Sequence, residues 1–283
     1  MSTPPPRIPP KRPNLVPPPP KSQQSTSVVR FGAVGKKAGH RVSLYGPGGI
    51  GKTTLACLAE GKSAIVDADE SLDVLSGQLE EMGIEIPVLI PASDFPSLRS
   101  NLQASGYDGI KNIILDTNTK IEEWCVAETV KTVRHPDKGT PVNSIEGYGF
   151  GKGFQFVFDK YLPLLADLDR HARAGRNVFL IMHECTSNVP NPNGEDWIRY
   201  EPRLQNPSSG KASIRLRVKE WCDHMLFFGY DVEVSKEGKA KGHGSRTLYT
   251  SEKPFCMAKS RTASSLESIS IVHGDNPWPL IIK

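Results

Sequence analysis

The sequence has no closely spaced cysteines and no long apolar run. Its five cysteines lie far apart, and no two of them form a Cys-x-x-Cys pair, so we expect neither a zinc site nor a disulfide framework. No stretch of about 18 apolar residues occurs, so we expect no membrane span. The first residues lack the apolar core of a secretory signal. These absences favour the reducing cytoplasm, and a hydrophobic fraction of 37% is enough for a sizeable core.

Acidic residues are missing from the first 59 positions, where nine Lys and Arg give a charge of +9. The remaining residues carry 26 Lys and Arg against 31 Asp and Glu, or −5, and the two parts sum to the net +4. Ten of the 24 prolines lie in residues 1–20. We therefore predict a disordered, Pro-rich basic tail over residues 1–27. It is either a solubilising segment or a tether for a single-strand-binding or replication protein.

From residue 28 onward, short apolar runs alternate with helical patterns. The expected strands are residues 41–45, 64–67, 88–90, 112–116, 178–183 and 224–229. The expected helices are residues 52–60, 72–82, 96–104, 120–134 and 154–174. This alternation predicts an α/β domain over residues 28–283, with a mostly parallel sheet covered by helices on both faces. Shorter extended runs near the C-terminus predict an antiparallel addition to the sheet, at residues 247–250, 255–258, 268–272 and 280–282.

A complete GxxxxGK[ST] pattern stands between an expected strand and an expected helix. That context is the one in which such a loop wraps phosphates. The glycines let backbone N–H groups point inward at phosphate oxygens, and the start of the helix adds positive charge. We expect Lys52 to reach the β- and γ-phosphates of ATP. The residues expected to bind the nucleotide are Gly46, Pro47, Gly48, Gly49, Ile50, Gly51, Lys52, Thr53 and Thr54.

Three further groups end expected strands, so a parallel sheet would bring them to one edge. Asp116 follows an apolar strand, and with Thr53 it is expected to hold Mg²⁺. Asp69 and Glu70 follow the second strand, and either is a candidate to orient and deprotonate the attacking water. Alternatively, Ser71 or Asp69 caps the next helix. His183 ends a later strand, where it would face the γ-phosphate and sense hydrolysis.

These motifs resemble the RecA core in order and spacing, over about residues 30–265. They are the phosphate loop, residues 65–73, residues 113–117 and residues 181–183. The chain looks most like the short phage-encoded RecA-like ATPases linked to single-strand annealing and recombination. The resemblance implies a catalytic carboxylate at Asp69, where RecA has Glu, and a γ-phosphate sensor at His183, where RecA has Gln.

The resemblance also implies that identical chains assemble into an oligomer. Residues 258–262 are similar to the Lys-x-Arg element of RecA-like ATPases such as RadA, in which two cations reach the γ-phosphate of a neighbouring subunit. Lys259 and Arg261 would do so here, in a ring or filament of identical chains. The alternative is that they are two solvated cations in a loop.

The family further implies two DNA-binding loops, and irregular stretches stand at both places. Residues 135–153 end in alternating glycines and aromatics, where Tyr148, Phe150 and Lys152 would stack on and pair with single-stranded DNA. A glycine-rich hinge with core-packed aromatics is the alternative. The second stretch, residues 185–212, is rich in Asn, Pro, Gly and Ser. Residues 236–261 add seven Lys and Arg against two acids. The DNA-binding candidates in and beside the second stretch are Trp197, Arg199, Arg203 and Lys211.

The sequence thus predicts an ATP- and Mg²⁺-dependent ATPase that binds single-stranded DNA and promotes annealing or recombination. We expect a phage-encoded protein of the host cytoplasm. Two other functions stay open. One is a different P-loop enzyme such as a small-molecule kinase, although the Asn-Lys-x-Asp run of guanine-specific proteins is absent. The other is a nucleotide-dependent loader that recruits a replication protein through its tail.

Overall fold

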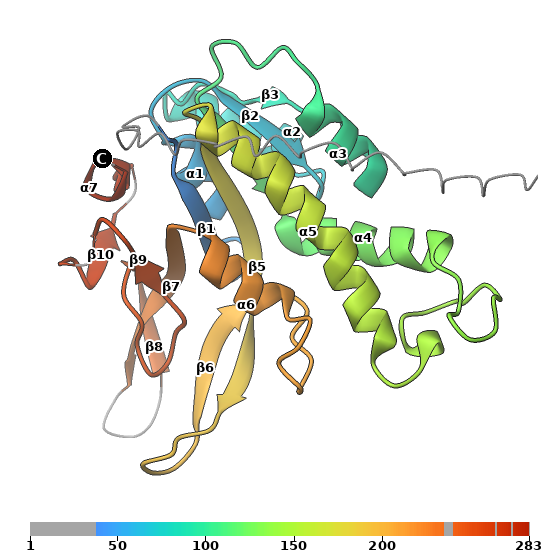
Figure 1. Ribbon diagram of the computed structural model, residues 1–283. Coiled ribbons are helices and arrows are strands. Elements are labelled where there is room, and N and C mark those ends of the chain that lie inside the picture. Colours follow the sequence, from blue (N-terminus) through green and yellow to red (C-terminus); the bar gives the residue numbers. More distant parts are fainter. Residues whose placement is uncertain (1–37, 235–239, 264, 273, 283) are drawn as a thin grey trace, which may run out of the picture. The chain divides into compact units, whose positions relative to one another are not determined.

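The computed structural model describes residues 38–234, 240–263, 265–272 and 274–282. The predicted tail over residues 1–27 lies outside them. The described residues form a ten-stranded sheet with helices packed against it (Figure 1). The strands are β1 (Arg41–Gly46), β2 (Ser63–Asp67), β3 (Val88–Leu89), β4 (Asn112–Asp116), β5 (Asn177–Val189), β6 (Trp197–Pro202), β7 (His224–Val234), β8 (Ala240–Tyr249), β9 (Lys259–Ser260) and β10 (Ser268–Ile271). The helices are α1 (Lys52–Cys57), α2 (Leu72–Glu81), α3 (Phe95–Gln103), α4 (Asn118–Thr132), the 3-10 helix η1 (Glu146–Tyr148), α5 (Lys152–Arg173), α6 (Ile214–Trp221) and α7 (Trp278–Ile281).

The strand order explains how distant motifs meet. Along the sheet it is β10-β8-β7-β1-β5-β4-β2-β3, with β6 paired to β5 and β9 paired to β7. All neighbours from β7 to β3 are parallel, whereas β6, β8, β9 and β10 pair antiparallel. The predicted fold class, with its antiparallel C-terminal addition, is confirmed. Because β5 lies between β1 and β4, the carboxyl ends of β1, β4 and β2 and the middle of β5 share one edge, which we call the carboxyl edge.

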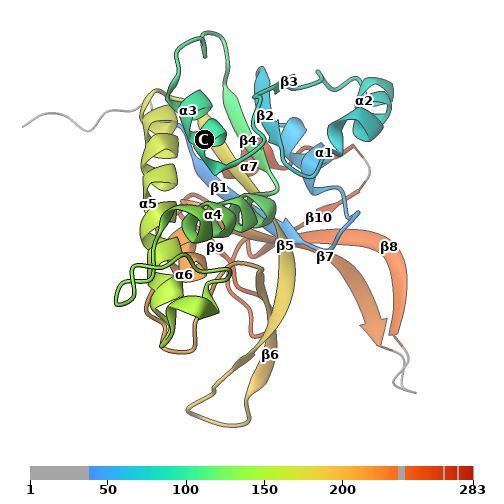
Figure 2. The same ribbon diagram turned by 90° about the vertical axis from the view of Figure 1, so that its right-hand side faces the viewer.

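The central strands are apolar throughout because helices cover both faces of the sheet. In β4, Ile113 and Leu115 pack into one core, and Ile114 between them packs into the other. In β5, Phe179 and Ile181 likewise face the second core. Buried residues of α3, α4, α5 and α6 belong to the first core, and those of α1, α2 and α7 to the second. Figure 2 shows α4 and α5 on one side of the sheet and α1 and α2 on the other. Continuous apolar runs are typical of strands buried in this way.

The stretch expected to be irregular after His183 contains a β-hairpin. Strand β5 continues to Val189 and pairs antiparallel with β6, from Glu184 opposite Pro202 to Val189 opposite Trp197. Figures 1 and 2 both show this β5–β6 hairpin projecting beyond the rest of the sheet. The expectation of a wholly irregular 185–212 segment was therefore wrong, because cross-strand pairing supplies the order that local composition does not.

Smaller differences concern the C-terminal part of the chain. Residues 280–282 were expected to be extended, but helix α7 covers most of them, with a proline in its first turn, where proline is tolerated. Residues 255–258 form a turn with isolated bridges rather than a strand. Helix α6 was not predicted. Among the described residues, every helix is too short or too polar to cross a lipid bilayer.

Candidate nucleotide-binding site

The phosphate loop connects β1 to α1 at the carboxyl edge. Gly49 and Gly51 have φ of 74° and 99°, a region that side chains disfavour, so these positions of the loop depend on glycine. The Lys52 ammonium lies within the loop, and Nζ donates to the carbonyls of Gly46 at 2.8 Å and Pro47 at 2.6 Å. Burial lowers the pKa of Lys52, and nearby carboxylates oppose this shift. The lysine is therefore held inside the loop, where the oxygens of a polyphosphate would replace the carbonyls as its partners.

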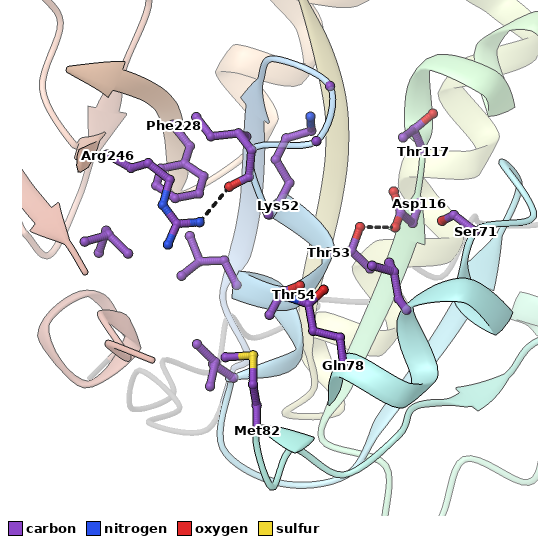
Figure 3. Close-up of a pocket in the computed structure, with 18 of the residues that line it drawn as sticks. Lys52, Thr53, Thr54, Ser71, Gln78, Met82, Asp116, Thr117, Phe228 and Arg246 are labelled. Carbon is purple, nitrogen blue, oxygen red and sulfur yellow. Dashed lines mark hydrogen bonds between the residues drawn. The ribbon is translucent and has the colours of Figure 1, made fainter. Parts of the chain in front are cut away.

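The end of β4 lies against the first turn of α1. Thr53 Oγ1 donates to Asp116 Oδ2 at 2.6 Å, and Asp116 is only 3% exposed. Burial raises the pKa of Asp116 to about 6. Figure 3 shows the two side chains joined by this bond. A hydroxyl and a carboxylate are ligands that suit Mg²⁺, which takes its other oxygens from nucleotide phosphates and water. No group of three His, Cys, Asp or Glu in the described residues is arranged to hold a metal by itself.

Three carboxylates stand at and after the end of β2, and they have two different roles: one binds the start of α2, and two line the pocket. Asp67 accepts hydrogen bonds from the backbone N–H groups of Ser71 at 3.0 Å and Leu72 at 2.8 Å, so its carboxylate satisfies the start of α2. Of the two alternative N-cap residues, Ser71 precedes α2 directly and Asp69 does not. Ser71 stands at the N-cap position, but its side chain makes no capping bond. Asp69 and Glu70 both line the pocket over the phosphate loop.

His183 lies beside the first glycine of the loop, because Gly46 in β1 pairs with His183 in β5. Its Nε2 is 3.5 Å from Asp69 Oδ2. Burial lowers the pKa of His183, and the charges of Lys52 and Arg203 lower it further. The backbone N–H of His183 donates to Thr119 Oγ1 at 3.2 Å, in the first turn of α4. Helix α1, β4, β5 and the loop after β2 thus bring together five predicted residues, which are Lys52, Thr53, Asp69, Asp116 and His183.

These residues open onto a cavity of about 570 Å³. It extends from the phosphate loop over α1 and reaches α2, the end of β10 and the residues after it. Sequence reasoning missed much of this lining. The missed residues include Val74, Gln78, Met82, Phe228, Arg246 and Val272. Arg246 was counted only as one of several cations in residues 236–261, and no local pattern marks the others.

Residues 38–262 match the family model described as an AAA domain. The chain belongs to this AAA domain family. The match covers most of the chain and includes all five of the assembled residues, so the predicted P-loop nucleotide-binding class is confirmed at the level of the family. No curated protein matches the chain. Among solved structures, the chain is similar to the crystal structure of the RadB recombinase, with 16% identity over 75% of this chain and 80% of that one, at a TM-score of 0.43.

Two predicted catalytic cations of the AAA domain lie far from its own phosphate loop. Lys259, in β9, pairs with Met225 near the start of β7. Arg261 Nη1 forms an ion pair with Asp223 at 3.0 Å, and Asp223 also binds Arg41 at the first residue of β1. The phosphate loop follows the last residue of β1, roughly 16 Å further along at ~3.3 Å per residue. Lys259 and Arg261 therefore lie on the side of the sheet away from the phosphate loop of the same chain.

The aromatic residues before α5 have contrasting surroundings. Tyr148 is 1% exposed, and its hydroxyl lies within hydrogen-bonding distance of the carbonyl oxygens of Thr129 at 3.2 Å and Val133 at 2.8 Å, to which its one proton can be donated. Its ring therefore has no free face for a base, which corrects the prediction that Tyr148 binds DNA. Phe150 is fully exposed. Lys152 Nζ pairs with Asp137 at 3.0 Å.

The predicted DNA-binding residues around the β5–β6 hairpin also differ in exposure and in ion pairing. Arg199 pairs with Glu201 and, at 2.8 Å, with Glu252, and each of these carboxylates is shared with a second cation, Arg215 or Lys219. Trp197 is half-buried at the end of the paired region. Arg203 and Lys211 are exposed, and neither forms an ion pair with any residue that the structure describes.

Proposed function

We propose that this AAA domain hydrolyses ATP to ADP and phosphate with Mg²⁺. The carrying observation is the convergence of Lys52, the Thr53–Asp116 pair and the Asp69–His183 pair on one cavity. Lys52 would hold β- and γ-phosphate oxygens, while Thr53 and Asp116 would hold Mg²⁺, which would neutralise charge on those oxygens. The cavity, at about 570 Å³, is large enough for a nucleotide.

We assign Asp69 as the group that orients the attacking water and accepts its proton. A bond forms from the water oxygen to the γ-phosphorus, and the bond from that phosphorus to the β,γ-bridging oxygen breaks. His183 lies 3.5 Å from Asp69 and is positioned to hold its carboxylate while a γ-phosphate is present. Glu70 lines the same cavity and is the alternative carboxylate.

We further propose that single-stranded DNA binds beside the β5–β6 hairpin, in annealing or recombination. Exposed Arg203 and Lys211 follow the hairpin, and exposed Phe150 precedes α5. Gln205 links the two segments, since its Nε2 donates to the carbonyls of Phe154 at 2.9 Å and Ala212 at 2.7 Å. Cations beside an exposed aromatic ring suit a phosphate backbone with unstacked bases.

The same hairpin is connected to the nucleotide site. The backbone N–H of Arg203 donates to the carbonyl of His183 at 2.9 Å, and β5 runs without a break from His183 to Val189. A displacement of His183 on loss of the γ-phosphate would therefore reach the DNA-binding segment directly.

The placement of Lys259 and Arg261 favours action on a neighbouring chain. Because both lie away from their own phosphate loop, we propose that they complete the site of an adjacent copy in a homo-oligomer. A phage origin and a cytoplasmic location complete the proposal, on the sequence resemblance described above.

The test is an ATPase titration with single-stranded and double-stranded DNA at two salt concentrations, with particle size measured in parallel. We expect single strands to raise turnover, the higher salt to weaken this effect, and larger particles to accompany it. A rate unchanged by any DNA would contradict the DNA-binding part and favour the kinase alternative.

A further inference from the structure

An arginine from the antiparallel addition reaches the outer side of the phosphate loop. Arg246 lies in β8, and its Nη1 donates to the carbonyl of Ile50 at 2.8 Å. A Cβ at Gly51 would lie 3.0 Å from this Nη1, which shows how closely the guanidinium approaches the loop. The guanidinium carbon is 5.4 Å from the centroid of the Phe228 ring, so the ring packs against the cation. Arg246 is therefore held in place by two contacts far from it in the sequence.

Among the described residues, most of the hydrogen-bonding capacity of Arg246 has no protein partner. A guanidinium carries five N–H donors, and the bond to Ile50 uses one of them. No carboxylate in the part of the chain that the structure describes forms an ion pair with it. Arg246 and Phe228 line the nucleotide cavity, and Figure 3 shows them on one side of it, with Thr53 and Asp116 on the other. Arg246 is thus a fixed cation with unused N–H donors, and it lines the side of the cavity away from Thr53 and Asp116.

The cavity also has apolar surface, which phosphates do not use. Its lining as a whole includes Leu58, Val74, Met82 and Val272, and Val74 and Val272 are 85% and 65% exposed. Exposed apolar side chains around a cavity suit a flat, poorly solvated ring. The phosphate loop accounts for the polyphosphate end of a ligand, which leaves the rest of the cavity, including the side of Arg246 and Phe228, for the ribose and the base.

We propose that Arg246 determines nucleotide affinity by holding the nucleoside half of ATP in the site of its own chain. A planar guanidinium offers donors to ribose and base acceptors and a cationic face to an aromatic ring. This inference rests on the proposed nucleotide-binding function. It adds a residue in cis, whereas Lys259 and Arg261 are proposed to act between chains.

Calorimetry with two probes separates the two parts of the site. Inorganic tripolyphosphate occupies only the phosphate loop, whereas ATP occupies both halves. For Arg246→Ala we expect ATP affinity to fall about tenfold, the range of a desolvated cation–ring contact, and tripolyphosphate affinity to stay within about twofold. Arg173→Ala is the control, because Arg173 is 77% exposed and lies in α5. If Arg246→Ala does not fold, Arg246→Lys carries the same comparison, since it keeps the charge but loses the planar fork.

Three outcomes would overturn the inference. Equal losses for both probes would mean that Arg246 acts only through the Ile50 carbonyl. Unchanged ATP affinity, or wild-type protein that binds ATP no better than tripolyphosphate, would mean that the guanidinium does not hold the nucleoside. A wild-type protein that binds neither probe would instead contradict the proposed function itself.

Discussion

His183 Nε2 lies 3.5 Å from Asp69 Oδ2, so β5 and the loop after β2 meet at the phosphate loop although β4 separates these two strands in the sheet. The contact joins the candidate sensor to one of the two candidate carboxylates. Asp69 also raises the pKa of Lys52 and of Asp116, although burial is the larger influence on both. The neighbouring Glu70 has a φ of 54° and lines the same cavity.

The two carboxylates can be separated by matched substitutions. We expect Asp69→Asn to lower kcat by about 100-fold or more, the usual contribution of a general base, with a smaller change in KM. Glu70→Gln should leave kcat within a few-fold of wild type. Steady-state ATPase kinetics of both variants decide the matter, and the reverse pattern would assign the water-activating role to Glu70.

Replacing the loop lysine tests the phosphate site. Lys52→Ala removes the ammonium that Gly46 and Pro47 now hold, and we expect kcat/KM for ATP to fall by about 100-fold or more, because charge that develops on phosphoryl oxygens loses a fixed cation. Lys131→Ala, at an exposed position of α4, is the control. Turnover close to wild type in a clean preparation of the variant would show that the phosphates bind elsewhere.

The raised pKa of Asp116 predicts a pH dependence. Below about pH 6 we expect its carboxyl group to be mostly protonated, and a protonated carboxyl group is a poor metal ligand. We therefore expect the Mg²⁺-dependent part of ATP affinity to fall about tenfold from pH 7 to pH 5. Asp116→Asn should bind weakly and lack this component, and equal slopes for the two proteins would contradict the assignment.

We do not expect the same protonation to unfold the protein. The pKa of Asp116 is higher in the folded chain than its usual value of 3.8, so the folded state binds the proton more tightly than the unfolded state. As the pH falls from about 6 to 4, this group therefore adds to the free energy of unfolding. Thermal melts across this range distinguish lost binding from lost structure.

Two neighbouring aromatic residues are expected to respond in opposite ways. Tyr148→Ala removes a buried ring and the hydroxyl that hydrogen-bonds to the carbonyls beside it, so the free energy of unfolding should fall by about 3 kcal/mol or more. Phe150→Ala should leave stability almost unchanged and weaken single-stranded DNA binding, by about 1–3 kcal/mol if a base stacks on the ring. Denaturant melts and fluorescence anisotropy measure the two effects. Unchanged DNA affinity in Phe150→Ala would exclude this ring from the DNA site.

Local patterns were sufficient for the parallel sheet and the phosphate loop. The strand ending at Asp116 was predicted with its observed bounds, because a buried strand reads as an unbroken apolar run between polar ends. The phosphate loop was predicted with equal success, since its glycines, lysine and threonine stand together in sequence. The convergence of Asp69, Asp116 and His183 followed from the rule that parallel strands end at one edge.

What the sequence did not predict depends on contacts between distant segments. The β5–β6 hairpin was missed because its residues include many turn formers, and only cross-strand pairing orders them. Burial of Tyr148 depends on carbonyls in and just after α4, and the position of Arg246 depends on Ile50 and Phe228. Such contacts leave no periodicity in the chain. The role of Asp67 as the acceptor for α2 was missed because three carboxylates stand close together at the end of β2 and differ only in where they point.

The unbroken course of β5 has a mechanical consequence. A hydrogen-bonded strand resists stretching. A displacement of one end of β5 would therefore tilt the other end, and would not order it residue by residue. In the proposed mechanism the hairpin would work as a lever whose short arm is His183 and whose long arm extends past Val189. A probe attached near the tip of the hairpin would magnify small events at the phosphates, and a proline placed in the paired part of β5 would disconnect the two ends while leaving each intact.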